Sequence, residues 1–213
     1  MATRQELNSE KTKQSILAAA NRLFAEKGYN GVSMREIAKE AKCSHTTIYI
    51  YFKDKDALLY ELSIPPLLDL KKKLEHALHH PSLSPDGKLK TISQEVIRFC
   101  LSNRSMYAIF FGVKAGRVDE KEPELEINKI RNELFGILSR ALMACLPLSE
   151  DDERLLIYSR IFFFHLHGIV GTYAHSNETL DSLLRRMSET FDEAMEVILC
   201  GMLCKIEEGD RMP

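Results

Sequence analysis

Glycine and proline are scarce in this chain of 213 residues, which contains 10 of the former and 7 of the latter. Both residues interrupt regular secondary structure, and here they fall between segments whose apolar residues recur with helical spacing. No strand-like alternation of apolar and polar residues is long enough to matter. The sequence therefore predicts an all-α fold.

Long apolar runs are also missing. None approaches the roughly 18 residues that a membrane span needs, and the run of large apolar residues at 161–164 is followed by His165. The first residues are polar and charged, without the apolar core of a signal peptide. We therefore expect a cytoplasmic protein.

The cysteines are odd in number and contain no Cys-x-x-Cys pair. The five lie at positions 43, 100, 145, 200 and 204, and in a cytoplasmic chain they are best explained as small buried hydrophobes. His76 and His80 share a helix face but have no acidic or cysteine partner at ligand spacing. We therefore expect neither a metal nor a cofactor.

Net charge is small, at −2, but its distribution is uneven. Residues 1–60 carry 10 Lys and Arg against 7 Asp and Glu, whereas residues 61–213 carry 19 against 24. A basic first segment on an acidic remainder suits a protein that presents one end to DNA.

A helix-turn-helix pattern occupies residues 33–52 of that basic segment. Ser33 followed by Glu36 forms a capping box, which predicts the start of a helix. Lys42 and Cys43 leave room only for a turn, and Ser44 can cap a second short helix. Two short helices joined by a turn of three or four residues match the geometry that enters the DNA major groove.

The second helix of this pattern has a polar leading edge. His45, Thr46 and Thr47 form its exposed first turn, while Ile48 and Phe52 return to the core. Asp54 then caps a further helix whose first residue is Lys55. This arrangement places polar side chains at base edges and a lysine beside the positive end of a helix dipole, which favours phosphate.

The first 60 residues resemble the DNA-binding domain of the TetR family of bacterial transcriptional regulators. The resemblance lies in three segments with the family's order and spacing, residues 16–29, 37–41 and 48–59. It departs from the family at Lys42, where glycine is usual, and at Cys43, where an aliphatic residue is usual. The resemblance implies dimerisation through the last two long helices, which form a four-helix bundle between subunits.

Helical periodicity and the resemblance together predict the residues that contact DNA. Tyr49 and Tyr51 match positions where the family has hydroxyl or imidazole groups suited to phosphate contact, and Ser33 and Arg35 begin the preceding helix. The predicted DNA-binding residues are Ser33, Arg35, Ser44, His45, Thr46, Thr47, Tyr49, Tyr51 and Lys55.

Two domains are predicted, a helix-turn-helix domain at 1–63 and a helical effector-binding and dimerisation domain at 64–213. The boundary is drawn at Pro65 and Pro66, where we expect the chain to bend. Besides the two short helices, we expect helices at about 9–27, 54–63, 67–80, 88–102, 105–115, 123–145, 150–174 and 178–205, and a frayed tail from 207.

The helix around 161–173 is apolar on nearly every side, so it must be covered on two faces. One face can pack within its own domain, and the simplest cover for the other is a second copy of the chain. Gly168 and Gly171 would allow a close approach, and Val170 is expected to face the partner. The sequence thus predicts a homodimer.

Aromatic and methionine side chains gather in the middle of the second domain, where a small-molecule site is expected. Sites between helices are mainly apolar with a few polar groups. The predicted ligand-binding residues are Phe99, Asn103, Met106, Tyr107, Phe110, Phe162, His165 and Tyr173. We expect an apolar or amphipathic effector, and a packed core is the alternative for each residue.

Three functions compete at this point. The first is a ligand-responsive repressor that binds a pseudo-palindromic DNA operator as a dimer. The second is a dimeric DNA-binding protein without an effector, whose C-terminal domain only dimerises or docks a protein. An enzyme is disfavoured, because no carboxylate pair, Glu-x-x-His pair or nucleophile–base arrangement occurs in the helices.

Overall fold

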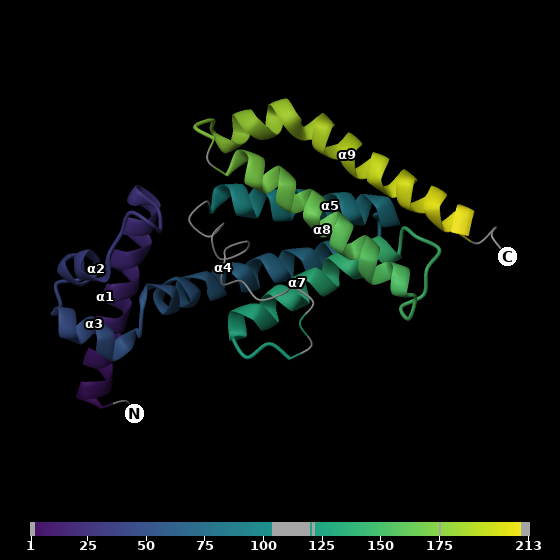
Figure 1. Ribbon diagram of the computed structural model, residues 1–213. Helices are drawn as coiled ribbons and strands as arrows, with labels where there is room; N and C mark the ends of the chain where they lie inside the picture. Colours follow the sequence, from purple (N-terminus) through teal and green to yellow (C-terminus); the bar gives the residue numbers. More distant parts are fainter. Residues whose placement is uncertain (1–2, 104–119, 121, 175, 210–213) are drawn as a thin grey trace. The chain divides into compact units, whose positions relative to one another are not determined.

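Every regular element that the structure describes is an α-helix, which confirms the predicted fold class. The computed structural model describes residues 3–103, 120, 122–174 and 176–209 (Figure 1). The helices are α1 (Arg4–Lys27), α2 (Met34–Glu40), α3 (His45–Tyr51), α4 (Lys55–Leu78), α5 (Pro85–Ser102), α7 (Glu126–Met143), α8 (Glu153–Tyr173) and α9 (Leu180–Gly209). The helix expected at 105–115 lies outside the described residues.

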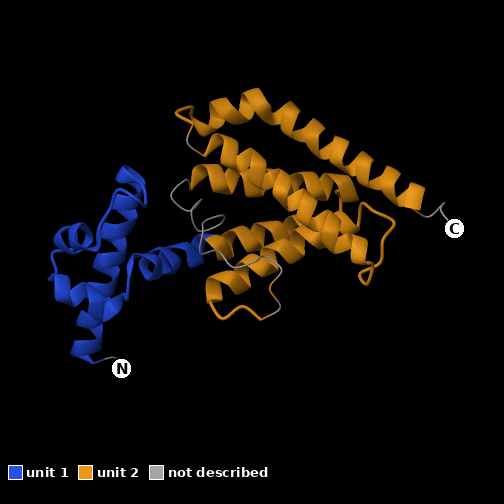
Figure 2. Cartoon of the chain, in the orientation of Figure 1, with its two compact units in different colours: residues 1–66, 104–115 blue, residues 67–103, 116–213 orange. Residues whose placement is uncertain are grey.

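The described chain divides into two compact units (Figure 2). The N-terminal unit comprises residues up to Pro66, and the C-terminal unit comprises residues 67–103 together with the described residues from 120 onward. The division falls within α4, which gives its first half to one unit and its second half to the other.

The core of the N-terminal unit is built from apolar residues at helical spacing on three helices. Ile16, Ala20 and Phe24 form the buried stripe of α1, and α2 packs against both α1 and α3. Ile37 from α2 and Ile48 from α3 are fully buried. This core fixes the two short helices of the predicted motif.

The first helix begins earlier than expected, at Arg4 rather than at about residue 9. The cause is a second capping box, in which the Glu6 amide donates to the Thr3 hydroxyl at 3.3 Å and the Thr3 amide donates to the Glu6 carboxylate at 2.6 Å. At the other end, Gly28 adopts the positive φ of 71° expected of a C-terminal cap.

The helix end expected near Pro65 and Pro66 is absent, because α4 runs through both prolines without a break. The two expected helices at 54–63 and 67–80 are therefore one. A proline inside a helix removes a backbone hydrogen bond and costs about 3 kcal/mol. Leucines on both sides of the pair are buried, which offsets this cost: Leu58, Leu59, Leu67, Leu70 and Leu74.

The C-terminal unit packs α5, α7 and α8 against one another, with α9 against α5 and α8 (Figure 1). Helix α5 begins at Pro85, earlier than expected, because Ser84 caps it and proline is tolerated in the first turn. Helices α7, α8 and α9 begin two to three residues later than expected, and α9 continues to Gly209 instead of fraying from residue 207.

Helix α8 has one buried face and one exposed apolar face. Phe162, Leu166 and Val170 point into the unit, so the expectation that Val170 faces a partner is wrong. Ile161 and Phe164 are instead 44% and 61% exposed. By length and composition alone α8 could cross a membrane, but it packs against α5, α7 and α9 as a helix of this unit.

Replacing Pro65 with alanine should stabilise the protein. Pro65 is exposed, so the substitution restores a backbone hydrogen bond in α4 without opening a cavity. The expected gain is about 2 kcal/mol in the free energy of unfolding, after allowance for a more flexible unfolded chain. Urea unfolding measures it. The control is Pro81→Ala, at an exposed proline between α4 and α5, which should give no gain. Equal effects of the two substitutions would contradict the prediction.

Candidate DNA-binding interface

The predicted helix-turn-helix is present as α2, a short turn and α3. The Glu36 amide donates to the Ser33 hydroxyl at 3.3 Å, and the Ser33 amide donates to the Glu36 carboxylate at 2.9 Å. These bonds, with Lys27 nearby, lower the pKa of Glu36 to about 2. Ser44 caps α3 by accepting the Thr47 amide at 2.9 Å. Both short helices therefore begin at the serines that the sequence indicated.

The turn between the helices has left-handed backbone geometry at Lys42, whose φ is 56°. The Lys42 amide donates to the Lys39 carbonyl at 3.2 Å, and the Cys43 amide donates to the Ala38 carbonyl at 3.0 Å. Glycine adopts this conformation without steric cost, whereas a side chain there costs about 1 kcal/mol. Lys42 therefore adopts the turn that the sequence predicted, although its side chain adds backbone strain and a positive charge that glycine would not.

Helix α3 presents a single exposed face. His45, Thr46, Tyr49 and Ile50 are all exposed, while Ile48 on the other side is fully buried. The rings of His45 and Tyr49 meet edge to face with centroids 5.1 Å apart. Three residues predicted to contact DNA thus share one face with Ile50.

Ile50 was not among the predicted contact residues. Its signal in the sequence is positional: a helix anchored by Ile48 must expose the residues at 45, 46, 49 and 50. Its side chain is apolar, yet it is 75% exposed.

Two other predicted contact residues on α3 have internal hydrogen bonds. The Thr47 hydroxyl lies 2.7 Å from the Ser44 hydroxyl, within the cap of the helix. The Tyr51 hydroxyl lies 3.2 Å from the Ser9 hydroxyl of α1. Both side chains are half-buried, so they hold α3 in place as well as lying beside its exposed face.

Arginine and lysine side chains surround this face. Arg35 at the start of α2, Lys42 in the turn and Lys53 after α3 are exposed and form no ion pair with any described residue. By contrast, Arg22 pairs with Glu40, and Lys27 pairs with Glu36 at 3.1 Å. Arg35, Lys42 and Lys53 therefore carry positive charges that an anionic ligand could neutralise.

Lys55 is held within the protein. Asp54 caps α4 by accepting the Ala57 amide at 2.8 Å, so Lys55 is the first helical residue as predicted. Its Nζ donates to the carbonyls of Tyr29 and Val32, both at 2.8 Å, and lies 4.2 Å from the centre of the Tyr29 ring. The side chain therefore ties α4 to the loop between α1 and α2.

Asp56 strengthens the same junction. It accepts the hydroxyl of Tyr29, and burial together with this bond raises the pKa of Tyr29. Lys13 of α1 adds an ion pair with Glu61 of α4 at 2.7 Å. The start of α4 is thereby fixed to α1 and to the loop that precedes α2.

The described members of the predicted ligand site are Phe99, Asn103, Phe162, His165 and Tyr173; Met106, Tyr107 and Phe110 lie outside the described residues. Asn103 caps α5, donating to the Phe99 carbonyl at 2.8 Å. The rings of Phe162 and His165 have centroids 6.2 Å apart. The buried His165 Nε2 has no hydrogen-bond partner among the described residues, and burial lowers the pKa of this imidazole.

A groove of about 250 Å³ between α5 and α9 lies near one member of this set. Phe191 lines it, and the Phe191 ring lies 6.0 Å from that of Tyr173. The other lining residues are Gln94, Ile97, Arg98, Leu184, Ser188 and Asp192. None of the described residues predicted to bind ligand lines this groove.

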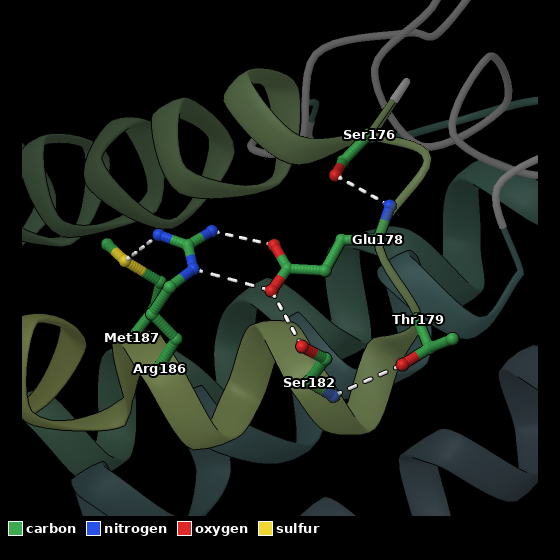
Figure 3. A network of polar contacts seen from close by, with 6 residues as sticks. All are labelled: Ser176, Glu178, Thr179, Ser182, Arg186 and Met187. Atoms are coloured by element: carbon green, nitrogen blue, oxygen red, sulfur yellow. Dashed lines mark hydrogen bonds and ion pairs between the residues drawn. The ribbon is translucent and has the colours of Figure 1, made fainter.

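The connection from α8 to α9 is held by a polar network (Figure 3). The Glu178 carboxylate accepts the Arg186 guanidinium at 2.7 Å and the Ser182 hydroxyl at 2.9 Å, which lowers the pKa of Glu178. The Ser182 amide donates to the Thr179 hydroxyl at 3.3 Å. These bonds tie the connection before α9 to the first two turns of that helix.

Comparison with known proteins identifies the chain. The family model described as bacterial regulatory proteins, tetR family, matches residues 16–62, which include all of α2 and α3. The HTH-type transcriptional regulator HbdR of Aromatoleum sp. (strain CIB) is 43% identical over 172 residues, which cover 73% of this chain and 68% of HbdR. The chain belongs to the TetR family.

Other relatives of this TetR-family regulator match over different extents. YuxN of Bacillus subtilis (strain 168), an HTH-type transcriptional regulator, is 45% identical over 65 residues, 27% of this chain and 22% of YuxN. The fatty acid degradation regulator FadR from Bacillus halodurans has the same fold, with a TM-score of 0.60 at 18% identity over 87% of this chain and 97% of that one.

FadR from Bacillus subtilis, whose structure is a complex with stearoyl-CoA, has a TM-score of 0.59 at 19% identity over 89% of this chain and 97% of that one. These likenesses show the fold. As a TetR-family member the chain is a DNA-binding transcriptional regulator and not an enzyme.

We expect Lys55→Ala to lower the free energy of unfolding by about 1–2 kcal/mol, because it removes two charge-assisted hydrogen bonds and a cation–π contact. Lys53→Ala is the control, since Lys53 is exposed and should change stability by less than about 0.5 kcal/mol. Urea unfolding compares them. An unchanged stability, with an altered salt dependence of DNA binding, would contradict this structural role. It would favour the phosphate contact that the sequence predicted for Lys55.

Proposed function

We propose that this regulator is a ligand-responsive repressor that acts in the cytoplasm and binds a pseudo-palindromic operator as a homodimer. In this proposal residues 1–63 bind DNA and residues 64–213 bind the effector and the second subunit. The observation that carries the DNA-binding part is the exposed face of α3, in which His45, Thr46 and Tyr49 lie together beside unpaired cations.

The roles of the interface residues follow from their positions. His45 and Thr46, in the first turn of α3, would contact base edges in the major groove. Tyr49 and Arg35 would contact phosphates, which set the position of the protein without reading sequence. The positive end of the α4 helix dipole would be a further phosphate site that leaves the Lys55 side chain in its internal contacts.

Recovery of genomic DNA by the purified protein tests this function. The recovered sequences should share a pseudo-palindrome with half-sites about one helical turn apart. His45→Ala should change the preference at one or two base pairs in each half-site by roughly 1–3 kcal/mol. Glu26→Ala, at an exposed α1 position, is the control. Recovery of DNA without a common sequence would contradict specific operator binding.

A second copy of the chain is the proposed cover for two exposed apolar stripes. The stripe on α8 contains Ile157, Ile161 and Phe164, and the stripe on α9 contains Val197 and Cys200. Gly168 and Gly201 lie in these stripes, with open space where a Cβ would stand, so another helix could approach closely. An obligate interface of this kind buries about 2,000 Å² or more.

Phe164→Glu should convert the dimer into monomers at micromolar concentration, because it would place an unpaired charge in the interface. Operator affinity should fall with it, since two half-sites are bound by two subunits. Sedimentation velocity measures the first effect. Leu68→Glu on α4, an exposed apolar residue outside both stripes, is the matched control. A stable Phe164→Glu dimer would exclude this interface.

The proposed effector is amphipathic, with an acyl chain as its apolar part. The B. subtilis FadR complex with stearoyl-CoA supports this choice by analogy of fold. Within this chain, the buried His165 Nε2 beside Phe162 offers a polar group in an apolar setting, as a site between helices has.

Stearoyl-CoA is the first probe of this effector class. If it is an effector, its affinity for the free protein should exceed that for the operator complex by about 5–150-fold, because the coupling between the two ligands is reciprocal. Isothermal titration of both states measures this ratio, and free coenzyme A is the control. Equal affinities would exclude stearoyl-CoA as an effector and favour a regulator whose C-terminal part serves only dimerisation or docking.

A further inference from the structure

Ile50 is the most exposed of the large apolar side chains in the described part of the chain, at 75%. It belongs to α3, whose buried side is anchored by Ile48 and continued by Phe52. Leaving such a side chain in water forgoes the free energy that its burial would contribute. Packing within the chain therefore does not explain an isoleucine at this position.

The neighbours of Ile50 indicate what covers it. On its own face are the polar groups of His45, Thr46 and Tyr49, and cations without ion pairs lie at either end of α3, at Lys42 and Lys53. A protein partner that buried this apolar side chain would also desolvate these charges. A polyanion would neutralise them, so the surroundings favour nucleic acid over protein.

Within the major groove of DNA, the C5 methyl group of thymine is the apolar group that the bases present. We propose that Ile50 packs against a thymine methyl in each operator half-site and so determines specificity at that base pair. This inference rests on the proposed function and adds an apolar contact to the polar ones expected of His45 and Thr46.

The edge-to-face contact between His45 and Tyr49 supports this role. Their ring centroids lie 5.1 Å apart, so the aromatic pair occupies one edge of the exposed face and Ile50 stands beside it, one residue further along the helix. Polar and apolar contacts on one helix face can then read adjacent base pairs, as direct readout requires.

Replacing thymine with uracil, which lacks only the methyl group, tests the contact in the full-length dimer. Each thymine of the recovered operator is replaced in turn, at symmetric positions in both half-sites, and the Kd is measured at one fixed salt concentration. At one position the wild-type protein should lose affinity about four-fold per half-site, the value for one buried methyl-sized group. Ile50→Ala should lose nothing at that position.

Two further variants complete the experiment. Ile50→Val keeps a branched apolar side chain and should retain the uracil effect. Leu7→Ala removes an exposed apolar side chain from α1 in the same unit and should behave as the wild type. Both positions tested are exposed, so the three variants should fold, which circular dichroism checks.

Several outcomes would overturn the inference. If uracil weakened the wild type and Ile50→Ala equally, another residue would contact the methyl group. If Ile50→Ala weakened binding to every sequence alike, Ile50 would pack on the sugar–phosphate backbone. In both cases operator binding, and with it the proposed function, would stand. Failure to recover any operator would overturn the proposed function and this inference together.

Discussion

Burial of Ile48 is the constraint on which the proposed DNA-binding face depends. Helix α3 has seven residues, too few to be stable alone, because helix nucleation costs more than a few backbone hydrogen bonds return. It exists because Ile48 and Phe52 are buried in the core and because Ser44 caps its first turn. The same anchoring decides which side chains face outward. The recognition surface is therefore a consequence of the apolar core beneath it.

The junction at the start of α4 extends this constraint along the chain. Lys55 donates to the Tyr29 carbonyl, and Asp56 accepts the Tyr29 hydroxyl. The loop between α1 and α2 therefore fixes the start of α4. Helix α4 then continues without interruption through Pro65 and Pro66 to Leu78. One helix thus belongs to both compact units, and its leucines are buried on either side of the prolines.

In the C-terminal unit, more apolar surface is present than one copy of the chain buries. Helix α8 directs Phe162, Leu166 and Val170 inward and leaves Ile161 and Phe164 in solvent. Contiguous exposed apolar residues of this kind mark an interaction site in a soluble protein. The sequence shows this excess of apolar residues as a helix that is apolar on nearly every side. Helical periodicity alone does not predict which of these residues are buried, because that depends on where the neighbouring helices pack.

Local signals were sufficient for much of this protein. Ser33, Ser44, Asp54 and Gly28 mark helix ends through bonds to residues close in the chain, so the sequence by itself determined the all-α class, the helix-turn-helix and the family. Tertiary structure decided the rest. Long-range packing keeps α4 helical through Pro65 and places Val170 inside the unit and Ile50 on its surface. A hydrogen bond to the distant Val32 carbonyl holds the Lys55 side chain. Each of these depends on residues distant in sequence, whose positions no local pattern contains.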